Sequence, residues 1–197
     1  MHFLVETACK DAEPSAQSCK LPQWLTFDYW EDISALASEA KEDRPDNTLG
    51  QLLERLVAGQ DVACDGCKRP GREHCSYWMH NKERISVSLS AHPAAPAAPE
   101  QPNDSTRPRI GAWTTCRTCH AQTPVTALSA AAYAFSFAKY AELVLYNSEF
   151  VPLPELCDHA SNDRNALVRS FSLGSTVVSL AVDQIECVQL ASHRFIR

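Results

Sequence analysis

The chain has 197 residues, a size that fits one domain with a sizeable core or two small domains sharing an interface. Its formal net charge of -6 excludes a dominant basic surface and therefore argues against broad binding to nucleic acid or to anionic membranes. No apolar run approaches the roughly 18 residues of a spanning helix, and the N-terminus lacks a signal-peptide pattern, so we expect a cytoplasmic protein without direct membrane insertion.

The first half of the chain predicts short strands and one helix. Extended structure is expected at Phe3-Leu4-Val5 and in the aromatic-rich stretch 21–30. Thr48 and Gln51 have the spacing of a capping box, and Gly59 is a natural stop for the helix that they open. One face of that helix would carry Leu49, Leu52, Leu53, Leu56 and Val57. Further on, Ile85, Val87 and Leu89 alternate with serines, as in a half-buried strand.

The second half begins with a change in composition. Residues 91–109 are rich in Ala and Pro and lack apolar periodicity, which predicts a flexible insertion. Ordered structure resumes at Ile110. Ser129 can cap a buried helix over 130–146, and apolar residues around Gly174 and Asp183 predict two or three short strands. We therefore divide the chain into an N-terminal half of a cysteine-rich domain (1–90), the insertion (91–109) and a second half (110–197).

Cysteine and histidine are gathered in two clusters. The first has the spacing Cys64-x2-Cys67-x6-His74-x5-His80, and the second has Cys116-x2-Cys119 followed later by Cys157-x-His159. Each offers four donors, the number that a closed tetrahedral zinc site needs. In a reducing compartment Cys-x2-Cys pairs favour metal binding over disulfides, and nine cysteines fit a closed disulfide framework poorly. The prediction is two structural zinc ions in an α+β fold with a small mixed or antiparallel sheet and two main helices.

Alternatives remain for the ligand sets. Cys75 competes with its neighbour His74 for a place in the first site. In a second arrangement one zinc is shared, as in a zinc ribbon, by the two Cys-x2-Cys pairs: Cys64, Cys67, Cys116 and Cys119. Three cysteines without close partners in the sequence, Cys9, Cys19 and Cys187, are interpreted as small core residues or inert thiols.

Known catalytic motifs are absent from the sequence. The sequence has no His-Glu-x-x-His zinc motif and no deaminase motif. Its six glycines form neither a Gly-x-Gly-x-x-Gly loop nor a Walker loop. The chain is therefore predicted to contain no catalytic residues and no cofactor-binding residues apart from the zinc ligands.

Five blocks of the sequence form a recognisable series: Asp46 to Glu54, Tyr77 to His80, Trp113 to Cys119, Ser136-Phe137-Ala138-Lys139-Tyr140-Ala141-Glu142-Leu143 and Cys157-Asp158-His159. Together they resemble the cysteine-rich region of phosphatidylinositol-3-phosphate 5-kinases. The fourth block is similar to that region's Ser-Phe-x-Lys-Tyr-Leu-Glu-Leu signature, with Ala141 in place of Leu. The resemblance covers nearly all of the chain.

The resemblance implies a fragment or truncated homologue of a large lipid kinase, without its FYVE finger, chaperonin-like domain and kinase domain. The parent enzyme would make phosphatidylinositol 3,5-bisphosphate, and ATP and magnesium would bind only in its kinase domain. This region would be a non-catalytic scaffold that meets other kinase domains and the scaffold and phosphatase subunits, at the periphery of endosomes or vacuoles. The alternative is a free-standing zinc module that binds another protein, as adaptors do. A nucleic-acid finger is disfavoured by the acidic balance.

Overall fold

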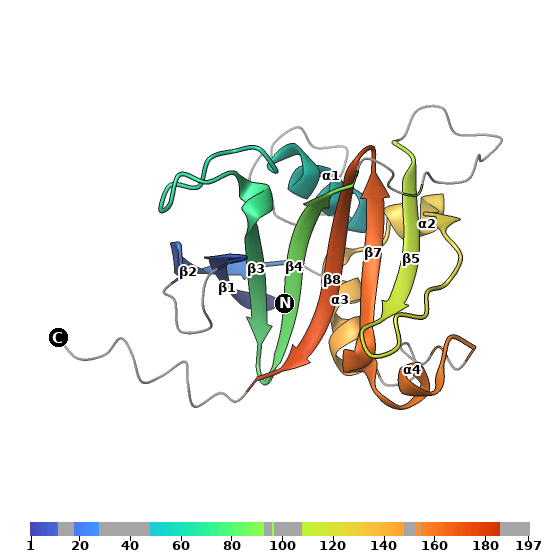
Figure 1. Ribbon diagram of the computed structural model, residues 1–197. Helices are drawn as coiled ribbons and strands as arrows, with labels where there is room; N and C mark the ends of the chain where they lie inside the picture. Colours follow the sequence, from blue (N-terminus) through green and yellow to red (C-terminus); the bar gives the residue numbers. More distant parts are fainter. Residues whose placement is uncertain are drawn as a thin grey trace, which may run out of the picture.

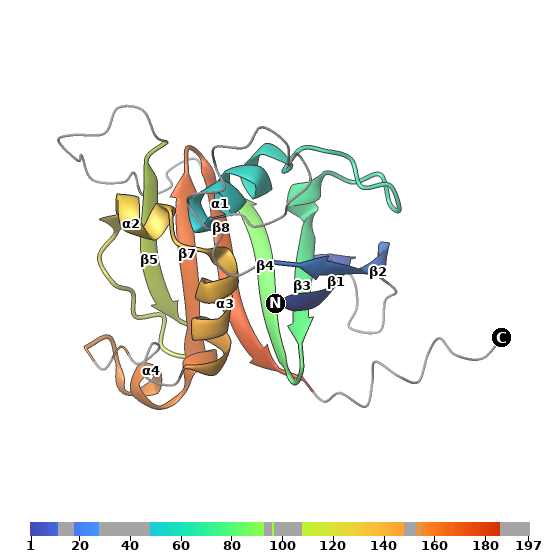
Figure 2. The same ribbon diagram turned by 180° about the vertical axis from the view of Figure 1, so that it is seen from behind.

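One antiparallel sheet is the centre of the molecule. The computed structural model describes residues 1–11, 18–27, 48–92, 96, 108–147, 153 and 155–185. Within these residues the sheet has eight strands in the order β2-β1-β3-β4-β8-β7-β5-β6. Figures 1 and 2 show that α1, α2 and α3 all lie on the same face of the sheet. The predicted α+β class with an antiparallel sheet is confirmed.

The bounds of the elements follow the chain. The strands are β1 His2–Cys9, β2 Lys20–Thr26, β3 His74–His80, β4 Glu83–Ala91, β5 Ile110–Cys116, β6 Thr126–Ala127, β7 Leu167–Leu173 and β8 Thr176–Gln184. The α-helices are α1 Leu49–Ala58, α2 Ala130–Tyr133, α3 Phe137–Tyr146 and α4 Asp158–Asn162, and short 3-10 turns are η2 Gly71–Glu73 and η3 Arg164–Ala166. The two main helices are α1 and α3, each of ten residues.

Helix α1 begins as its sequence predicts. The Thr48 hydroxyl accepts a hydrogen bond from the Gln51 backbone N–H at 3.3 Å, and the Gln51 side chain accepts one from the Thr48 N–H at 3.1 Å. This reciprocal capping box satisfies two backbone donors that the first turn would otherwise leave free. The helix buries Leu49, Leu52 and Leu53 against the sheet and ends at Gly59. The prediction for this helix is confirmed.

The single helix predicted over 130–146 is wrong, because the chain breaks at Ala134 and Phe135. Ser129 caps the short α2, and Ser136 starts α3 by accepting a hydrogen bond from the Lys139 N–H. The break places the Phe135 carbonyl where it accepts the N–H of Leu49, the first residue of α1, at 2.8 Å. A free donor at the start of one helix is thus satisfied by the gap between two others.

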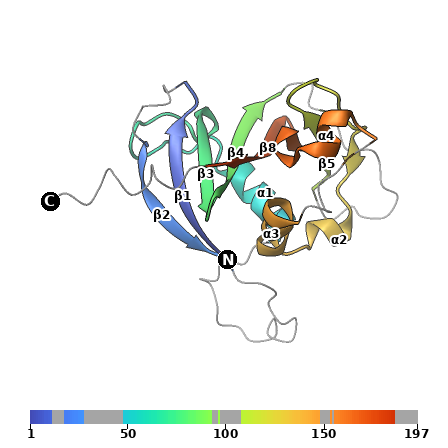
Figure 3. The ribbon, with the colours of Figure 1, turned by 90° about the horizontal axis from the view of Figure 1, so that it is seen from below.

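The core lies between the helices and the concave side of the sheet (Figure 3). Ile85 and Val87 of β4 stand opposite Val182 and Leu180 of β8, and all four are buried. The half-buried strand predicted from the alternation with serine is therefore confirmed. An aromatic group extends the core toward the N-terminus, with Trp78 stacked on Phe27 at 5.7 Å between centroids and edge-on to Phe137 at 5.2 Å. Such pairs add to the stabilisation from apolar burial.

The remaining predicted segments lie partly within the described residues. The N-terminal strand is confirmed as β1, the stretch 21–30 is a strand as far as Thr26, and the strands around Gly174 are β7 and β8. Most of the insertion 91–109, the end of the stretch 21–30, and Cys187 lie outside the described residues. The sheet takes strands from both predicted halves, since β4 pairs with β8 over its whole length.

A glycine inside α1 tests the packing of the helices. A Cβ atom on Gly50 would lie 2.1 Å from Cδ2 of Tyr133 in α2, so the two helices approach there more closely than alanine allows. Gly50→Ala should lower the free energy of unfolding by about 1–3 kcal/mol through overpacking, even though alanine favours helices by about 1 kcal/mol. Denaturant-induced unfolding followed by circular dichroism measures this change.

Gly59→Ala is the matched control at the end of the same helix. Its added Cβ would meet nothing nearer than the Arg55 carbonyl oxygen at 3.4 Å, and φ is −84°, which alanine adopts freely. Equal stability of the two variants would contradict the close approach of α1 and α2.

Candidate metal centres

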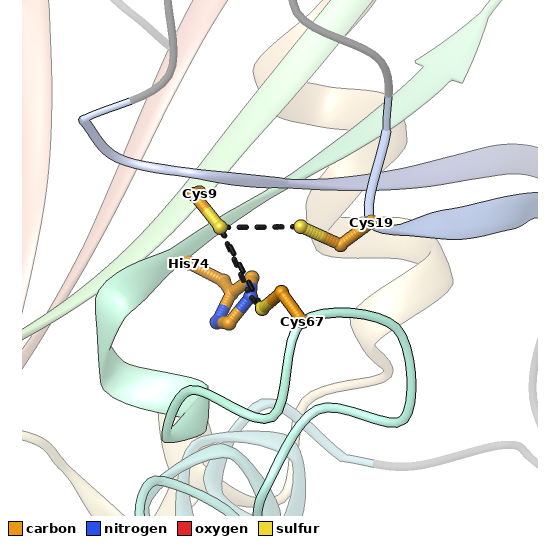
Figure 4. A group of neighbouring side chains, drawn as sticks. All are labelled: Cys9, Cys19, Cys67 and His74. Atoms are coloured by element: carbon orange, nitrogen blue, oxygen red, sulfur yellow. Dashed lines mark hydrogen bonds between the residues drawn. The ribbon is translucent and has the colours of Figure 1, made fainter.

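The first cluster joins four side chains from four places along the chain (Figure 4). Cys9 ends β1, Cys19 directly precedes β2, Cys67 lies in the loop after α1, and His74 begins β3. Their ligand atoms all lie within 4.8 Å of one another. The Cys9 Sγ atom is 3.2 Å from the Cys19 Sγ atom and 3.6 Å from the Cys67 Sγ atom. These distances would bring all four donors to one metal ion.

His74 is oriented by its own loop. Its Nδ1 atom lies 3.0 Å from the Pro70 carbonyl oxygen, and because a carbonyl can only accept, Nδ1 carries the hydrogen. The unprotonated Nε2 then faces the thiols, 3.0 Å from Cys67 Sγ and 3.6 Å from Cys9 Sγ. A hydrogen bond of this kind, donated by the second ring nitrogen, orients a metal-bound histidine in proteins. The imidazole is almost fully buried, at 4 % exposure.

The loop that carries Cys67 is a tight knuckle of the Cys-x2-Cys type. The Cys64 N–H donates to the Arg69 carbonyl at 2.8 Å, and the Lys68 N–H donates to the Cys64 carbonyl at 2.8 Å. Lys68 completes the turn with φ of 62°, in the left-handed region. Gly66 is required inside this knuckle, because a Cβ there would lie 1.9 Å from the Cys19 carbonyl oxygen. The knuckle thus packs directly on the backbone between β1 and β2.

The structure changes the ligand set predicted for the first cluster. It keeps Cys67 and His74, adds Cys9 and Cys19, and does not include Cys64 or His80. His80 cannot reach the site because it ends β3, the strand that His74 begins, and its Nδ1 atom is hydrogen bonded to the Tyr146 hydroxyl. The interpretation of Cys9 and Cys19 as inert thiols has to be corrected accordingly.

Cys75 does not compete with His74. It is the next residue of β3, so its side chain points to the other face of the sheet. Burial there raises the pKa of the Cys75 thiol, against the opposing effect of a hydrogen bond with Tyr77. The alternation of the strand resolves a choice that the sequence left open.

The second cluster contains all four residues predicted for it. Cys116 ends β5, Cys119 follows in a loop, and Cys157 and His159 lie at the start of α4. Its knuckle repeats the first: the Cys116 N–H donates to the Ala121 carbonyl at 2.9 Å, and the His120 N–H donates to the Cys116 carbonyl at 3.0 Å. His120 has φ of 60°, as Lys68 has 62°. Two unrelated stretches of sequence therefore form the same turn.

The two clusters are separate, which rules out the shared zinc ribbon. The first is built around β1, β2 and β3 near one edge of the sheet, and the second lies beyond β5 near the other edge. In Figure 1 the first cluster corresponds to the loop before β3 and the second to the region of α4, toward opposite edges of the sheet. Cys67 and Cys119 thus belong to different sites.

The pKa values of the cysteine thiols differ between the two clusters. Hydrogen bonding with Cys19, together with burial and the nearby Cys67, raises the pKa of Cys9 to about 12. Backbone hydrogen bonding from Cys119 lowers the pKa of Cys116 to about 6, with help from Thr118 and against the effect of burial. The pKa of Cys157 is raised, chiefly by burial. At neutral pH these shifts favour the thiolate form of Cys116 and the protonated form of Cys9.

The donor chemistry of both clusters fits zinc. Three thiols and one imidazole form one of the usual ligand sets of structural zinc, and thiolates exclude the hard ions magnesium and calcium. Four protein donors fill a tetrahedral ion, so each cluster would act as a clamp between distant segments. In the first, Cys9 and Cys67 are 58 residues apart in sequence.

Sequence reasoning missed Cys9 and Cys19 because neither belongs to a Cys-x2-Cys pair. A usable signal was present: both flank the turn of the predicted N-terminal extended segments, at places where a hairpin would bring its ends together. The backbone N–H of Cys19 donates to the Thr7 carbonyl at 2.8 Å. This hydrogen bond holds Cys19 beside β1, the strand that ends at Cys9.

The close approach at Gly66 gives a test that leaves every ligand in place. Gly66→Ala should push the knuckle away from Cys19 and weaken metal binding at the first cluster by more than about tenfold, or 1.4 kcal/mol. Competition with a zinc chelator measures it. Asp65→Ala, in the same knuckle, is the control, because the Asp65 side chain is 93 % exposed and its ion pair with Lys20 spans 3.9 Å. Equal zinc affinity of the two variants would refute the role of Gly66.

Acid should release metal from the first cluster before the second. Ligand thiols must lose their protons when a metal binds, so a thiol with a raised pKa makes binding steeper in pH. Cys9, with a pKa of about 12, remains protonated in the free site throughout the neutral range, whereas Cys116, with a pKa of about 6, is already ionised there. As the pH falls from about 8 to 6, zinc affinity should therefore drop more at the first cluster.

Site-specific variants allow that measurement. Cys116→Ser/Cys119→Ser leaves only the first cluster, and Cys9→Ser/Cys19→Ser leaves only the second. Zinc retained after dialysis at each pH is then determined by elemental analysis. Release from both clusters at the same pH, or from the second at the higher pH, would contradict the assignment of proton affinities.

Among known proteins, the chain is distantly similar to 1-phosphatidylinositol 3-phosphate 5-kinases. The chain is 29% identical over 181 residues to mouse 1-phosphatidylinositol 3-phosphate 5-kinase, and the match covers 86% of this chain and 8% of the mouse protein. The human protein of the same name matches equally, at 29% identity over 181 residues. The yeast (Saccharomyces cerevisiae) 1-phosphatidylinositol 3-phosphate 5-kinase FAB1 is 23% identical over 178 residues, which covers 89% of this chain and 7% of the yeast protein. The chain therefore spans less than a tenth of the length of these relatives.

No protein-family model matches the chain, and no solved structure matches it. Within the described residues, the helices are too short or too polar to cross a membrane.

Proposed function

We propose that this chain, a distant homologue of a short segment of 1-phosphatidylinositol 3-phosphate 5-kinases, is a zinc-stabilised scaffold region of such a kinase. The observation that carries the proposal is the match itself, which extends over 86% of this chain but only 8% of the mouse kinase. A homologous unit of this size, within a much longer enzyme, fits a supporting region of the larger protein. The two Cys3His clusters explain how such a unit is held together.

The metal in this proposal is structural. A catalytic zinc keeps a coordination position open for water or substrate, with three protein ligands. Each cluster here supplies four donors of its own. The first ties the hairpin of β1 and β2 to the knuckle and to β3, and the second ties the end of β5 to α4. The role of these residues would be to fix a shape, and phosphate transfer would belong to another part of the parent enzyme.

The resemblance to these kinases is the basis for proposing partners and a location. If the chain works as part of a 1-phosphatidylinositol 3-phosphate 5-kinase, its partners would be the remaining domains of that enzyme and scaffold and phosphatase subunits. The lipid in the names of these kinases, phosphatidylinositol 3-phosphate, would place the assembly at the surface of endosomes or vacuoles, with this region contributing no membrane insertion of its own. ATP and magnesium would be bound by the kinase domain alone.

Complementation in trans tests the scaffold role. We expect this chain to co-purify with the mouse relative from which the matching segment has been deleted, and to restore part of its synthesis of phosphatidylinositol 3,5-bisphosphate. The purified chain alone should contain about two zinc ions per molecule, one for each four-donor cluster, and should not transfer phosphate from ATP to phosphatidylinositol 3-phosphate.

The matched control removes the metal clamps. A variant with Cys9, Cys19, Cys116 and Cys119 all changed to Ser should lose the zinc, unfold at a lower temperature and fail to co-purify, because structural zinc contributes folding free energy directly. Binding of this variant at the level of the unchanged chain would refute a zinc-stabilised scaffold. Phosphate transfer by the chain alone would refute the non-catalytic role.

A further inference from the structure

A fourth thiol, and so a fifth possible donor, lies in the knuckle of the first cluster. Cys64 is 5% exposed and is the first cysteine of the Cys-x2-Cys pair, three positions before Cys67. It is outside the group formed by Cys9, Cys19, Cys67 and His74. The first knuckle therefore contributes one of its cysteines to the cluster, whereas the second knuckle contributes both.

The backbone does not explain this difference. In both knuckles the N–H of the first cysteine donates to the carbonyl five residues on, and the N–H four residues on donates back to the carbonyl of that cysteine. The distances are 2.8 and 2.8 Å around Cys64 and 2.9 and 3.0 Å around Cys116. The residue after the second cysteine is left-handed in both, at φ of 62° and 60°. Cys64 is thus placed in its turn as Cys116 is placed, and Cys116 is a cluster member.

His74, and not Cys64, is the fourth member of the group that contains Cys67. The His74 Nε2 atom lies 3.0 Å from the Cys67 Sγ atom, and the ring is held from the other side by the Pro70 carbonyl. Zinc accepts four protein ligands in such sites, and either a fourth thiolate or an imidazole completes the set beside three thiolates. Five donors therefore meet four coordination positions.

We propose that the first site is a five-donor zinc site in which Cys64 and His74 are alternative fourth ligands beside Cys9, Cys19 and Cys67. The inference rests on the zinc binding of the proposed function and adds an exchange to it. In the exchange the bond from zinc to His74 Nε2 breaks, a bond from zinc to the Cys64 sulfur forms, and the thiol proton of Cys64 passes to the released Nε2. The total charge of zinc and its five donors stays the same.

In the part of the chain that the structure describes, the knuckle of the second site has no cysteine left outside its group. Its group holds Cys116, Cys119, Cys157 and His159, with both cysteines of the knuckle already included. His159 is its one histidine, as His74 is the one histidine of the first site. The two histidines therefore form a matched pair for an experiment.

The experiment compares His74→Ala with His159→Ala in the whole chain. His74→Ala should keep about two metal ions per molecule after dialysis against a chelator, because four thiolates remain, whereas His159→Ala should keep about one. With cobalt in place of zinc, the ligand-field absorption of His74→Ala should shift toward that of a site with thiolate ligands only. The double variant Cys64→Ser/His74→Ala should lose the first metal, and Cys64→Ser alone should keep it.

The outcomes separate this inference from the zinc assignment itself. Loss of a metal ion from His74→Ala or from Cys64→Ser, with two ions in the unchanged chain, would overturn the alternative ligands and leave zinc binding intact. So would retention of both ions by the double variant. An unchanged chain without zinc would refute the proposed function as well. Circular dichroism of each variant with metal shows that a lost ion does not reflect an unfolded chain, and Cys75→Ser is the control for removal of a neighbouring thiol outside the cluster.

Discussion

The pairing of β4 with β8 joins the two halves of this molecule. Strands β2, β1, β3 and β4 come from residues 2–91, strands β8, β7, β5 and β6 come from residues 110–184, and the register from Glu83↔Gln184 to Ala91↔Thr176 connects the two sets. Behind this pair lie α1 from the first half and α3 from the second, so the core is shared. On the opposite face, Asp183 accepts hydrogen bonds from Arg84 at 3.2 Å and Arg117 at 2.7 Å. Charged hydrogen bonds of this kind add to the pairing across the two halves.

The two candidate metal sites lie where few apolar side chains are buried. The edge strand β2 has Leu21 72% and Trp24 71% exposed, so apolar burial holds that hairpin weakly, and a metal ion in the first cluster would fasten it at Cys19. At the other edge, the second cluster lies beside a small apolar group in which Ala160 and Leu167 are buried. Metal ligands can replace apolar burial where a layer is too small to stabilise itself. With metal bound, each half would have its own clamp, while the central sheet is held by packing.

The sequence predicted most of this architecture but only part of the sites. Local signals sufficed for α1, because Thr48 and Gln51 cap it and its apolar face is regular, and for β4, because serine alternates with Ile85, Val87 and Leu89. The break at Ala134 was missed because it serves a contact at Leu49, far away in sequence. The second cluster was predicted in full from its pairs. In the first, Cys9 and His80 were misjudged because strand register, which sequence spacing does not reveal, decides which residues meet.

Long-range pairing at the centre of the sheet has a consequence for how the chain folds. Arg84 and Asp183 are 99 residues apart, so β4 leaves the ribosome long before its partner strand exists. Until then β4 is an open edge whose Ile85, Val87 and Leu89 side chains and backbone hydrogen-bonding groups can pair with other chains. Non-local topologies of this kind fold slowly. All four residues of the first cluster lie between positions 9 and 74. A zinc ion bound there would therefore order the leading strands of the nascent chain before β8 is synthesised.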